Sequence, residues 1–375
     1  MRRRGASHIV GSCVLVLTTA CGGRTAEAPP ARWVADATPT TDIPGSGPSG
    51  EVWLERPVAA ARLASGEIAV ADAGAKSVLF FDTHGQLLRR AGREGGGPGE
   101  YRNLLWLGQC QRDSLFAWDP ARSRIVVLDT AGTVVRHFAV PMVWAVACNR
   151  TGRVVLVGQP NPGSTATVNG TPYASVGVSL LAPTGAGLDT IMHMPLFDAR
   201  FIPQPPPLGA VATVALTAER IYVGTPDTNS VSVYTSAGQL EGTVLVHTSR
   251  RPATERHFEA AIEAIVDAAP PDWRTSLRQQ IHGMVQKPEW LPFYGSLFAD
   301  SLERVWAQTS FPGDSATVLG AVGDAGAAEI VVSRPLTVFE VGTNYVLGTY
   351  AAPDGTPHVA LYTFRPQGPR GQDGV

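Results

Sequence analysis

The sequence lacks the short motifs by which many metal and nucleophile sites are recognised. It contains no His-Glu-x-x-His, no Cys-x-x-Cys, no EF-hand loop and no Gly-x-Ser-x-Gly elbow. Its eight histidines are scattered along the chain, and we interpret them as surface residues rather than metal ligands. We therefore expect no metal and no cofactor, and the chain fits a binding protein better than an enzyme.

Charge is also scarce, and it does not gather in basic runs. Charged residues make up 17% of the chain, and the formal net charge is −2. Nucleic-acid binding needs basic residues that neutralise phosphates, so we do not expect a nucleic-acid partner. A hydrophobic content of 44% is enough for a buried core, and 40 glycines with 30 prolines favour many tight turns over long helices.

No apolar run at the N-terminus is long enough to span a bilayer. Arg2-Arg3-Arg4 precedes a short apolar stretch from Ile9 to Leu17, which predicts a signal peptide over residues 1–20. The segment that ends in Ala20-Cys21 resembles a bacterial lipobox. This resemblance implies lipidation of Cys21 and an exported, membrane-anchored protein in the periplasm or at the cell surface. The alternative is an ordinary signal peptide with an incidental cysteine.

Residues 21–50 are rich in proline, glycine and serine and predict a flexible tether, although Ala31–Val34 could add a strand to the folded body. Residues 367–375 are expected to form a disordered tail. Cys110 and Cys148 each precede a repeat start by the same distance and should occupy equivalent strands in neighbouring units. They could form a disulfide in an oxidising compartment or remain buried thiols.

The chain repeats itself. The pattern from Gly66 to Asp72, followed by Val78–Asp82, returns 47 residues later as Asp113–Asp119, followed by Ile125–Asp129. Short strands with such a period indicate a solenoid, propeller or array. We delimit six units of about four strands and predict an all-β fold over residues 51–366, a six-bladed β-propeller of four-stranded antiparallel blades. Glu51–Leu54 is the expected closing strand of the sixth blade.

The connector Gly92–Tyr101, with its Gly97-Pro98-Gly99-Glu100-Tyr101 sequence, resembles the inter-blade connector of NHL-type propellers. Pro288–Pro292, followed by Asp300 and Val305-Trp306, resembles a late blade of bacterial six-bladed propeller lipoproteins. The resemblance implies the propeller fold and an exported location. That family is largely uncharacterised, so the resemblance implies little about function.

One segment breaks the repeat. Thr254 can cap a helix with apolar residues at helical spacing, Pro270-Pro271 stops it, and Asp272 can cap a second helix. This helical hairpin, within residues 253–287, is expected between blades four and five. It is interpreted as a lid packed on the ring, with a partner- or ligand-contact device as the alternative.

Inter-blade loops and the loops between second and third strands emerge on one face of a propeller, and long loops mark that face as the binding face. It is expected to gather the helical hairpin, the proline-rich run 203–207 and the long loop 159–174. The candidate ligand-binding residues there are Arg56, Tyr101, Arg102, Asn103 and Arg334. The three arginines favour an anionic group, with strand capping or ion pairing as the alternative.

Three functions remain open from the sequence. The first is a binding module for an unknown protein, peptide or glycan, attached to the membrane only through its lipid. The second is a hydrolase or lyase, similar to propeller lactonases, with a loop-borne and calcium-dependent site. The inner strands are apolar or small, which disfavours a ring of oxygen ligands in the channel. The third is a periplasmic scaffold with no small ligand.

Overall fold

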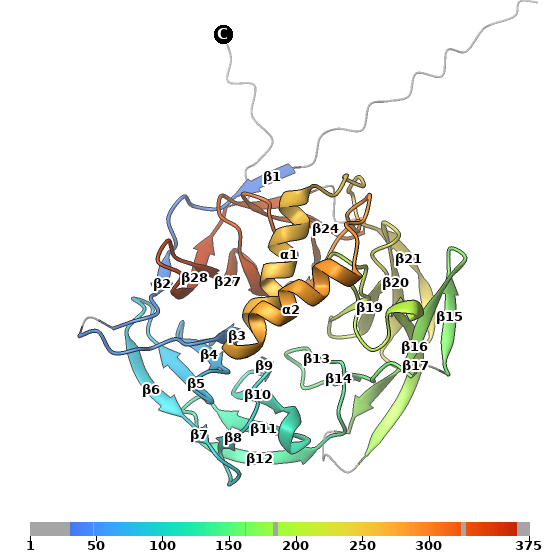
Figure 1. The fold of residues 1–375 in the computed structure, drawn as a ribbon. Helices are drawn as coiled ribbons and strands as arrows, with labels where there is room; N and C mark the ends of the chain where they lie inside the picture. The colour runs from blue at the N-terminus through green and yellow to red at the C-terminus, as the bar shows by residue number, and fades with distance from the viewer. Residues whose placement is uncertain (1–30, 48, 162, 183–186, 324–327, 366–375) are drawn as a thin grey trace, which may run out of the picture.

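The computed structural model describes residues 31–47, 49–161, 163–182, 187–323 and 328–365. Signal residues 1–20, the lipidation candidate Cys21 and the tail 367–375 therefore lie outside the described residues. The described strands form six radial sheets around a central axis (Figure 1). This is a six-bladed β-propeller, and most of its blades are four antiparallel strands, as the sequence predicts.

The first two blades have four strands each. Blade one is built from β3 (Pro57–Arg62), β4 (Ile68–Asp72), β5 (Ser77–Phe81) and β6 (Leu87–Ala91). Blade two is built from β9 (Trp106–Gln111), β10 (Ser114–Asp119), β11 (Arg124–Asp129) and β12 (Val134–Ala139), with the short helix η1 (Pro120–Arg122) between β10 and β11. The connector between these blades forms a small parallel pair, β7 (Arg93–Glu94) and β8 (Glu100–Tyr101).

Blade three is the most elaborate. It contains β13 (Ala145–Cys148), β14 (Val154–Val157), β15 (Thr165–Val168), β16 (Thr171–Leu181) and β17 (Leu188–Asp198), followed by η2 (Ala199–Phe201). The expected long loop 159–174 is largely a hairpin, because β15 pairs with the first half of β16. Blade four is regular and contains β18 (Thr213–Leu216), β19 (Arg220–Gly224), β20 (Ser230–Thr235) and β21 (Leu240–Leu245).

The last two blades each recruit a strand from the N-terminal segment. Blade five has β22 (Leu297–Ala299), β23 (Val305–Gln308), β24 (Thr317–Ala321) and β25 (Ala328–Val332), with β1 (Ala31–Val34) added in parallel to β25. Blade six has β26 (Thr337–Val341), β27 (Tyr345–Ala351) and β28 (Pro357–Thr363), and β2 (Thr41–Ile43) pairs antiparallel with β28.

The closing strand is therefore β2, and the prediction that Glu51–Leu54 closes the ring is wrong. The side chains of Trp53 and Leu54 are buried between blades one and six, but the backbone of these residues is not part of a β-strand. Residues 21–30 of the expected tether 21–50 lie outside the described residues. The rest of the range is corrected, because β1, at the position where the sequence allows an added strand, and β2 both belong to the folded body.

The core lies between neighbouring blades. Successive side chains of a strand point to opposite faces of its sheet, so each blade packs against two neighbours. In blade one, Ala69 and Phe80 contact the blade-two side, whereas Ile68 and Leu79 contact the blade-six side. Strands β4 and β5 are buried along their whole length for this reason. These almost continuous apolar strands form the pattern that repeats in the sequence of blades one and two.

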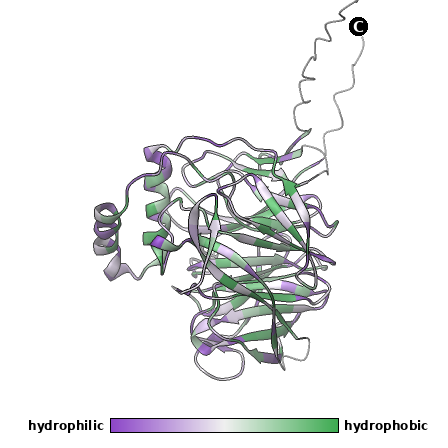
Figure 2. Cartoon of the chain, turned by 90° about the vertical axis from the view of Figure 1, so that its right-hand side faces the viewer, coloured by the Kyte–Doolittle hydropathy of each residue, from purple (hydrophilic) through white to green (hydrophobic). Residues whose placement is uncertain are grey.

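Two helices lie in the chain between β21 and β22: α1 (Glu255–Ala268) and α2 (Pro271–Met284). Thr254 caps α1 through a capping box with His257. The second helix begins at Pro271 and not after Asp272, because a proline fits the first helical turn, where its missing N–H would have no partner. The hairpin lies across one face of the ring (Figures 1 and 2).

Candidate functional site: two mouths of the central channel

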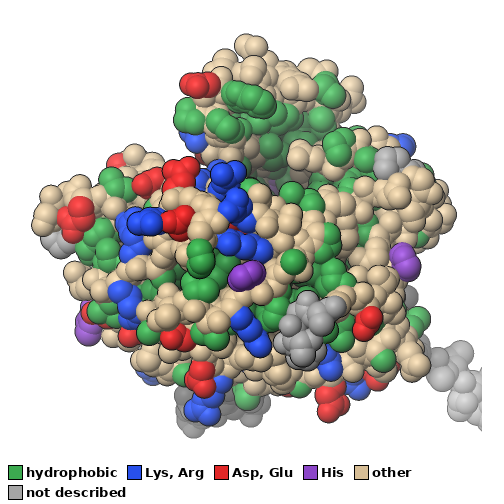
Figure 3. Space-filling view, turned by 90° about the horizontal axis from the view of Figure 1, so that it is seen from below, with side chains coloured by type: hydrophobic (Ala, Val, Ile, Leu, Met, Phe, Trp, Pro, Cys, Tyr) green, Lys and Arg blue, Asp and Glu red, His purple; other side chains and the backbone are tan. Residues whose placement is uncertain are grey.

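A pocket of about 500 Å³ lies under the helical hairpin. We call it the insert pocket. Figure 3 shows the hairpin projecting from the ring with a recess beneath it. Its lining comes from the starts of inner strands, from α1, from the proline-rich segment and from loops of blade five: Trp144, Gln204–Gly209, Val211–Thr213, Ala261, Ala264, Ile265, Pro292, Tyr294–Ser296, Phe311 and Pro312.

No charged side chain is among these lining residues. Tyr294 is fully buried, and its hydroxyl donates a hydrogen bond to the Ser230 carbonyl oxygen at 2.8 Å. Burial raises the pKa of Tyr294, so its phenol stays neutral at physiological pH. The insert pocket is therefore an apolar, uncharged site with a few hydroxyl and amide groups, within the usual size range of small-molecule pockets.

An ion pair and a histidine contact hold the start of α1 and the segment before it against blade five. The Arg251 guanidinium pairs with the Asp314 carboxylate at 2.7 Å, and His257 Nε2 lies 3.2 Å from the same carboxylate. Burial opposes ionisation of Asp314, but hydrogen bonds from Arg251, the Phe311 amide and His257 outweigh it and lower the pKa of Asp314 to about 2. Asp314 is therefore ionised under physiological conditions and fixes the position of the helix.

None of the five candidate ligand residues lines the insert pocket. Tyr101 belongs to the core between blades one and two, where burial raises the pKa of its hydroxyl. The backbone amides of Arg102 and Asn103 donate to the Asp119 carboxylate at 3.1 and 3.0 Å. Arg334 places its guanidinium over the ring of Tyr350, 4.1 Å from the centroid. These contacts belong to the scaffold.

Arg56 alone of the five contacts the hairpin. Its Nη1 donates to the carbonyl oxygen of Ala268, the last residue of α1, at 3.1 Å. Its backbone amide donates to Asp72, which is fully buried and stands where Asp119 stands in the next repeat. The expected cluster of three arginines facing an anion is not formed, since neither channel cavity is lined by Arg56, Arg102 or Arg334.

A second cavity of about 340 Å³ occupies the other end of the channel, and we call it the opposite mouth. Its lining includes the final residues of inner strands, such as Leu216 of β18, Val341 of β26 and Cys148 of β13. The insert pocket instead uses residues at the starts of inner strands. The two cavities therefore open at opposite ends of the same channel. The sequence analysis did not identify this cavity, because its polar residues come from turns in several blades that lie far apart in the chain.

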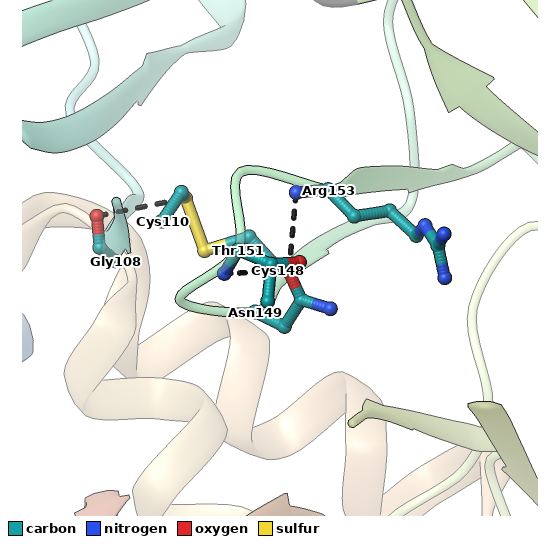
Figure 4. The surroundings of a disulfide bond; sticks show 6 residues. All are labelled: Gly108, Cys110, Cys148, Asn149, Thr151 and Arg153. Carbon is teal, nitrogen blue, oxygen red and sulfur yellow. Dashed lines mark hydrogen bonds between the residues drawn. A yellow bond between two sulfur atoms is a disulfide. The ribbon is translucent and has the colours of Figure 1, made fainter. Parts of the chain in front are cut away.

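The disulfide between Cys110 and Cys148 lies at this opposite mouth. Cys110 of β9 and Cys148 of β13 form a disulfide that joins the inner strands of blades two and three (Figure 4). Cys110 is fully buried, and Cys148 lines the cavity. The adjoining turn is tied to blade four, because Asn149 Nδ2 donates to the Thr217 carbonyl oxygen at 2.6 Å. Three consecutive blades are thus linked around this end of the channel.

Among the residues that the structure describes, no helix is both long and apolar enough to cross a membrane. In the same part of the chain, no group of three His, Cys, Asp or Glu side chains is arranged to hold a metal ion.

Comparison with known proteins supports the fold. No protein-family model matches the chain, and no curated protein matches it in sequence. A candidate exported protein from Bacteroides fragilis is similar in structure, with a TM-score of 0.50 and 9% identity, over 90% of this chain and 99% of that one. A member of the DUF4221 family from Bacteroides vulgatus is similar with a TM-score of 0.51 and 10% identity, over 88% and 97%.

Propeller enzymes also appear among the structural neighbours. A virginiamycin B lyase from Staphylococcus aureus is similar with a TM-score of 0.40 and 9% identity, over 82% of this chain and 94% of that one. At such identities the likeness carries no information on activity. The likeness to the candidate exported protein and to the DUF4221 member, each over almost the whole of both chains, agrees with the fold and shows the fold alone.

Proposed function

We propose that this protein is an exported, lipid-anchored binding module that takes an uncharged, largely apolar ligand into the insert pocket. The observation that carries the proposal is the lining of that pocket, about 500 Å³ without a charged side chain, closed on one side by an added helical hairpin. An apolar ligand gains free energy by leaving water for such a lining, roughly 25 cal/mol per Å² of apolar surface buried.

The ligand class differs from the anionic group expected from the sequence. An anion would lose its hydration in this pocket and meet no cation among the lining residues, which is unfavourable. A hydrophobic side chain of a peptide or partner protein, or a small apolar molecule, meets aromatic and proline surfaces from Trp144, Pro206 and Phe311. No described feature specifically favours the alternative of a calcium-dependent hydrolase or lyase.

The pocket is tested with N-phenylnaphthylamine, an uncharged apolar dye that fluoresces when it leaves water. We expect saturable binding to the purified protein and a loss of about tenfold or more in affinity for Ala264→Trp, because an indole at this exposed pocket position occupies the cavity. Ala268→Trp is the matched control, since Ala268 is exposed on the same helix but does not line the pocket. Equal binding by both variants would contradict the proposal.

Lipid anchoring is a separate part of the proposal and rests on the lipobox-like Ala20-Cys21 sequence. Growth with radioactive palmitate should label the wild-type protein and leave Cys21→Ala unlabelled. Labelling that persists in Cys21→Ala would show that the lipid is attached elsewhere. The dye-binding experiment would still test the insert pocket, because it does not depend on lipidation.

A further inference from the structure

The opposite mouth differs in character from the insert pocket. Aromatic side chains from three blades line it: Trp106 of β9, Phe298 of β22 and Phe339 of β26. All three are partly exposed although each packs against an apolar core, so part of each ring remains accessible. The faces of aromatic rings carry partial negative charge and attract organic cations.

The charged residues at this mouth are balanced except for one carboxylate. Arg150 pairs with Glu340 at 2.9 Å, and Glu340 also accepts hydrogen bonds from the Arg62 amide and the Tyr345 hydroxyl. Asp300 is fully buried and pairs with Arg304 at 2.6 Å. These acids are neutralised or saturated by the protein itself.

Glu303 is the exception. It is exposed at the cavity, and its Oε2 accepts a hydrogen bond from the Ala218 amide, but no cationic side chain pairs with it among the described residues. The loop that carries it is fixed by Asp300, whose Oδ1 accepts from the amides of Leu302 and Arg304. The Glu303 carboxylate is thus held at the mouth with negative charge available to a ligand.

Gln109 adds an unpaired acceptor to this mouth. Gln109 lines the cavity, is only 8% exposed, and donates through Nε2 to the Arg112 carbonyl oxygen at 2.8 Å. Its Oε1 is buried without a hydrogen-bond partner among the described residues. Asn149 Nδ2 and the Thr151 hydroxyl each donate to a partner within the protein. A ligand that supplies positive charge and a hydrogen-bond donor complements this mouth.

We propose that the opposite mouth is a second binding site, for a small organic cation that carries a hydroxyl or amine. The cationic group lies against the aromatic side chains and near Glu303, and the donor satisfies the Gln109 acceptor. The site is independent of the insert pocket, since it lies at the other end of the channel, and it does not rest on the function proposed above.

Choline is a suitable probe, because it combines a quaternary ammonium with one hydroxyl. Titration calorimetry of the purified protein should detect choline binding, and the neutral carbon isostere of choline should bind about tenfold more weakly or not at all. Glu303→Gln should lower the affinity for choline by about fivefold or more, since it removes the unpaired charge. Phe339→Leu should also lower the affinity for choline, because it removes an aromatic ring and keeps an apolar side chain.

Glu219→Gln is the matched control. Glu219 is an exposed carboxylate in the corresponding turn of blade four and does not line the cavity, so this variant should bind choline like the wild type. Far-UV circular dichroism and melting temperature check that each variant is folded. The proposal is overturned if choline does not bind, if its neutral isostere binds equally well, or if Glu303→Gln and Glu219→Gln behave alike.

Discussion

The Nε2 atom of His257 in α1 lies 3.2 Å from the Oδ1 atom of Asp314 in the loop between β23 and β24. The Nδ1 atom of the same ring lies 3.0 Å from the Thr254 hydroxyl at the start of the helix. One imidazole thus completes the helix cap and joins the helix to blade five. The backbone approaches closely here too, because a Cβ on Gly313 would lie 2.8 Å from the Arg256 carbonyl oxygen.

Replacement of this carboxylate should make stability depend less on pH in the acid range. Asp314 has a pKa of about 2 in the folded protein against an ordinary value of 3.8, so the unfolded chain binds its proton first as pH falls. The stability that the ionised Asp314 carboxylate adds to the fold is fully present above about pH 5, and it is lost as the pH falls from about 4 to 2. The free energy of unfolding of Asp314→Asn at pH 7 should therefore be about 1 kcal/mol lower than that of the wild type, after allowance for partial exposure of the carboxylate.

Urea denaturation of both proteins at a series of pH values measures this difference. Asp267→Asn serves as the control, because the Asp267 side chain is 71% exposed and lies 3.8 Å from Arg274 in a surface pair. A gap between wild type and Asp314→Asn that stays constant from pH 7 to pH 2 would contradict the assignment.

The turn at Gly85 should be intolerant of a side chain. Gly85 has φ +80°, and a Cβ there would lie 2.4 Å from the carbonyl oxygen of Asp42 in the closing strand β2. Gly355 has a similar φ of +83° but an open surrounding. We expect Gly355→Ala to cost about 1 kcal/mol of unfolding free energy from backbone strain and Gly85→Ala about 1–3 kcal/mol more from the clash. Equal losses in thermal denaturation would show that β2 is free to move away.

Removal of the disulfide should destabilise the ring. The bond joins residues 38 positions apart, and constraining an unfolded loop of that length is worth about 4 kcal/mol on the loop-entropy model. The double variant Cys110→Ala with Cys148→Ala should lose up to this amount in urea denaturation. A reducing agent should lower the stability of the wild type alone; if it lowers both proteins equally, another process is responsible.

Most of the architecture could be predicted from sequence because each blade packs on both faces. The apolar strands β4 and β10, with Asp72 and Asp119 at their ends, recur at the same place in neighbouring blades. Both carboxylates accept amide hydrogen bonds from the preceding inter-blade connector, Asp72 from Glu55 and Asp119 from Asn103. These two acids therefore hold the connectors against corresponding strand ends of their blades.

The closing strand could not be identified from its residues. Glu51–Leu54 directly precedes the first unit, and that position favours a closing strand. In the structure Trp53 and Leu54 are buried, but from irregular backbone. The true strand, Thr41–Ile43, contains a single aliphatic residue, Ile43. Its pairing with β28 depends on contacts more than 300 positions away, which local patterns do not report.

The candidate site was predicted only in part. The proline-rich run and the helical hairpin do contribute to one pocket, as expected for a shared binding face. The arginines do not line this pocket: Arg334 lies over the ring of Tyr350, and Arg102 is exposed outside the pocket lining. The opposite mouth combines residues from several blades that are distant in sequence, so they come together only when the ring is closed.

The bridge between Ala35 and Phe364 brings the first and last described segments together beside blades five and six. A short linker across these neighbouring ends would rejoin the chain, and new termini could then be opened in an exposed turn such as the one at Gly170. A circle of this kind has no obligatory starting blade, so a reporter domain could be placed near either channel mouth while every strand pairing is retained.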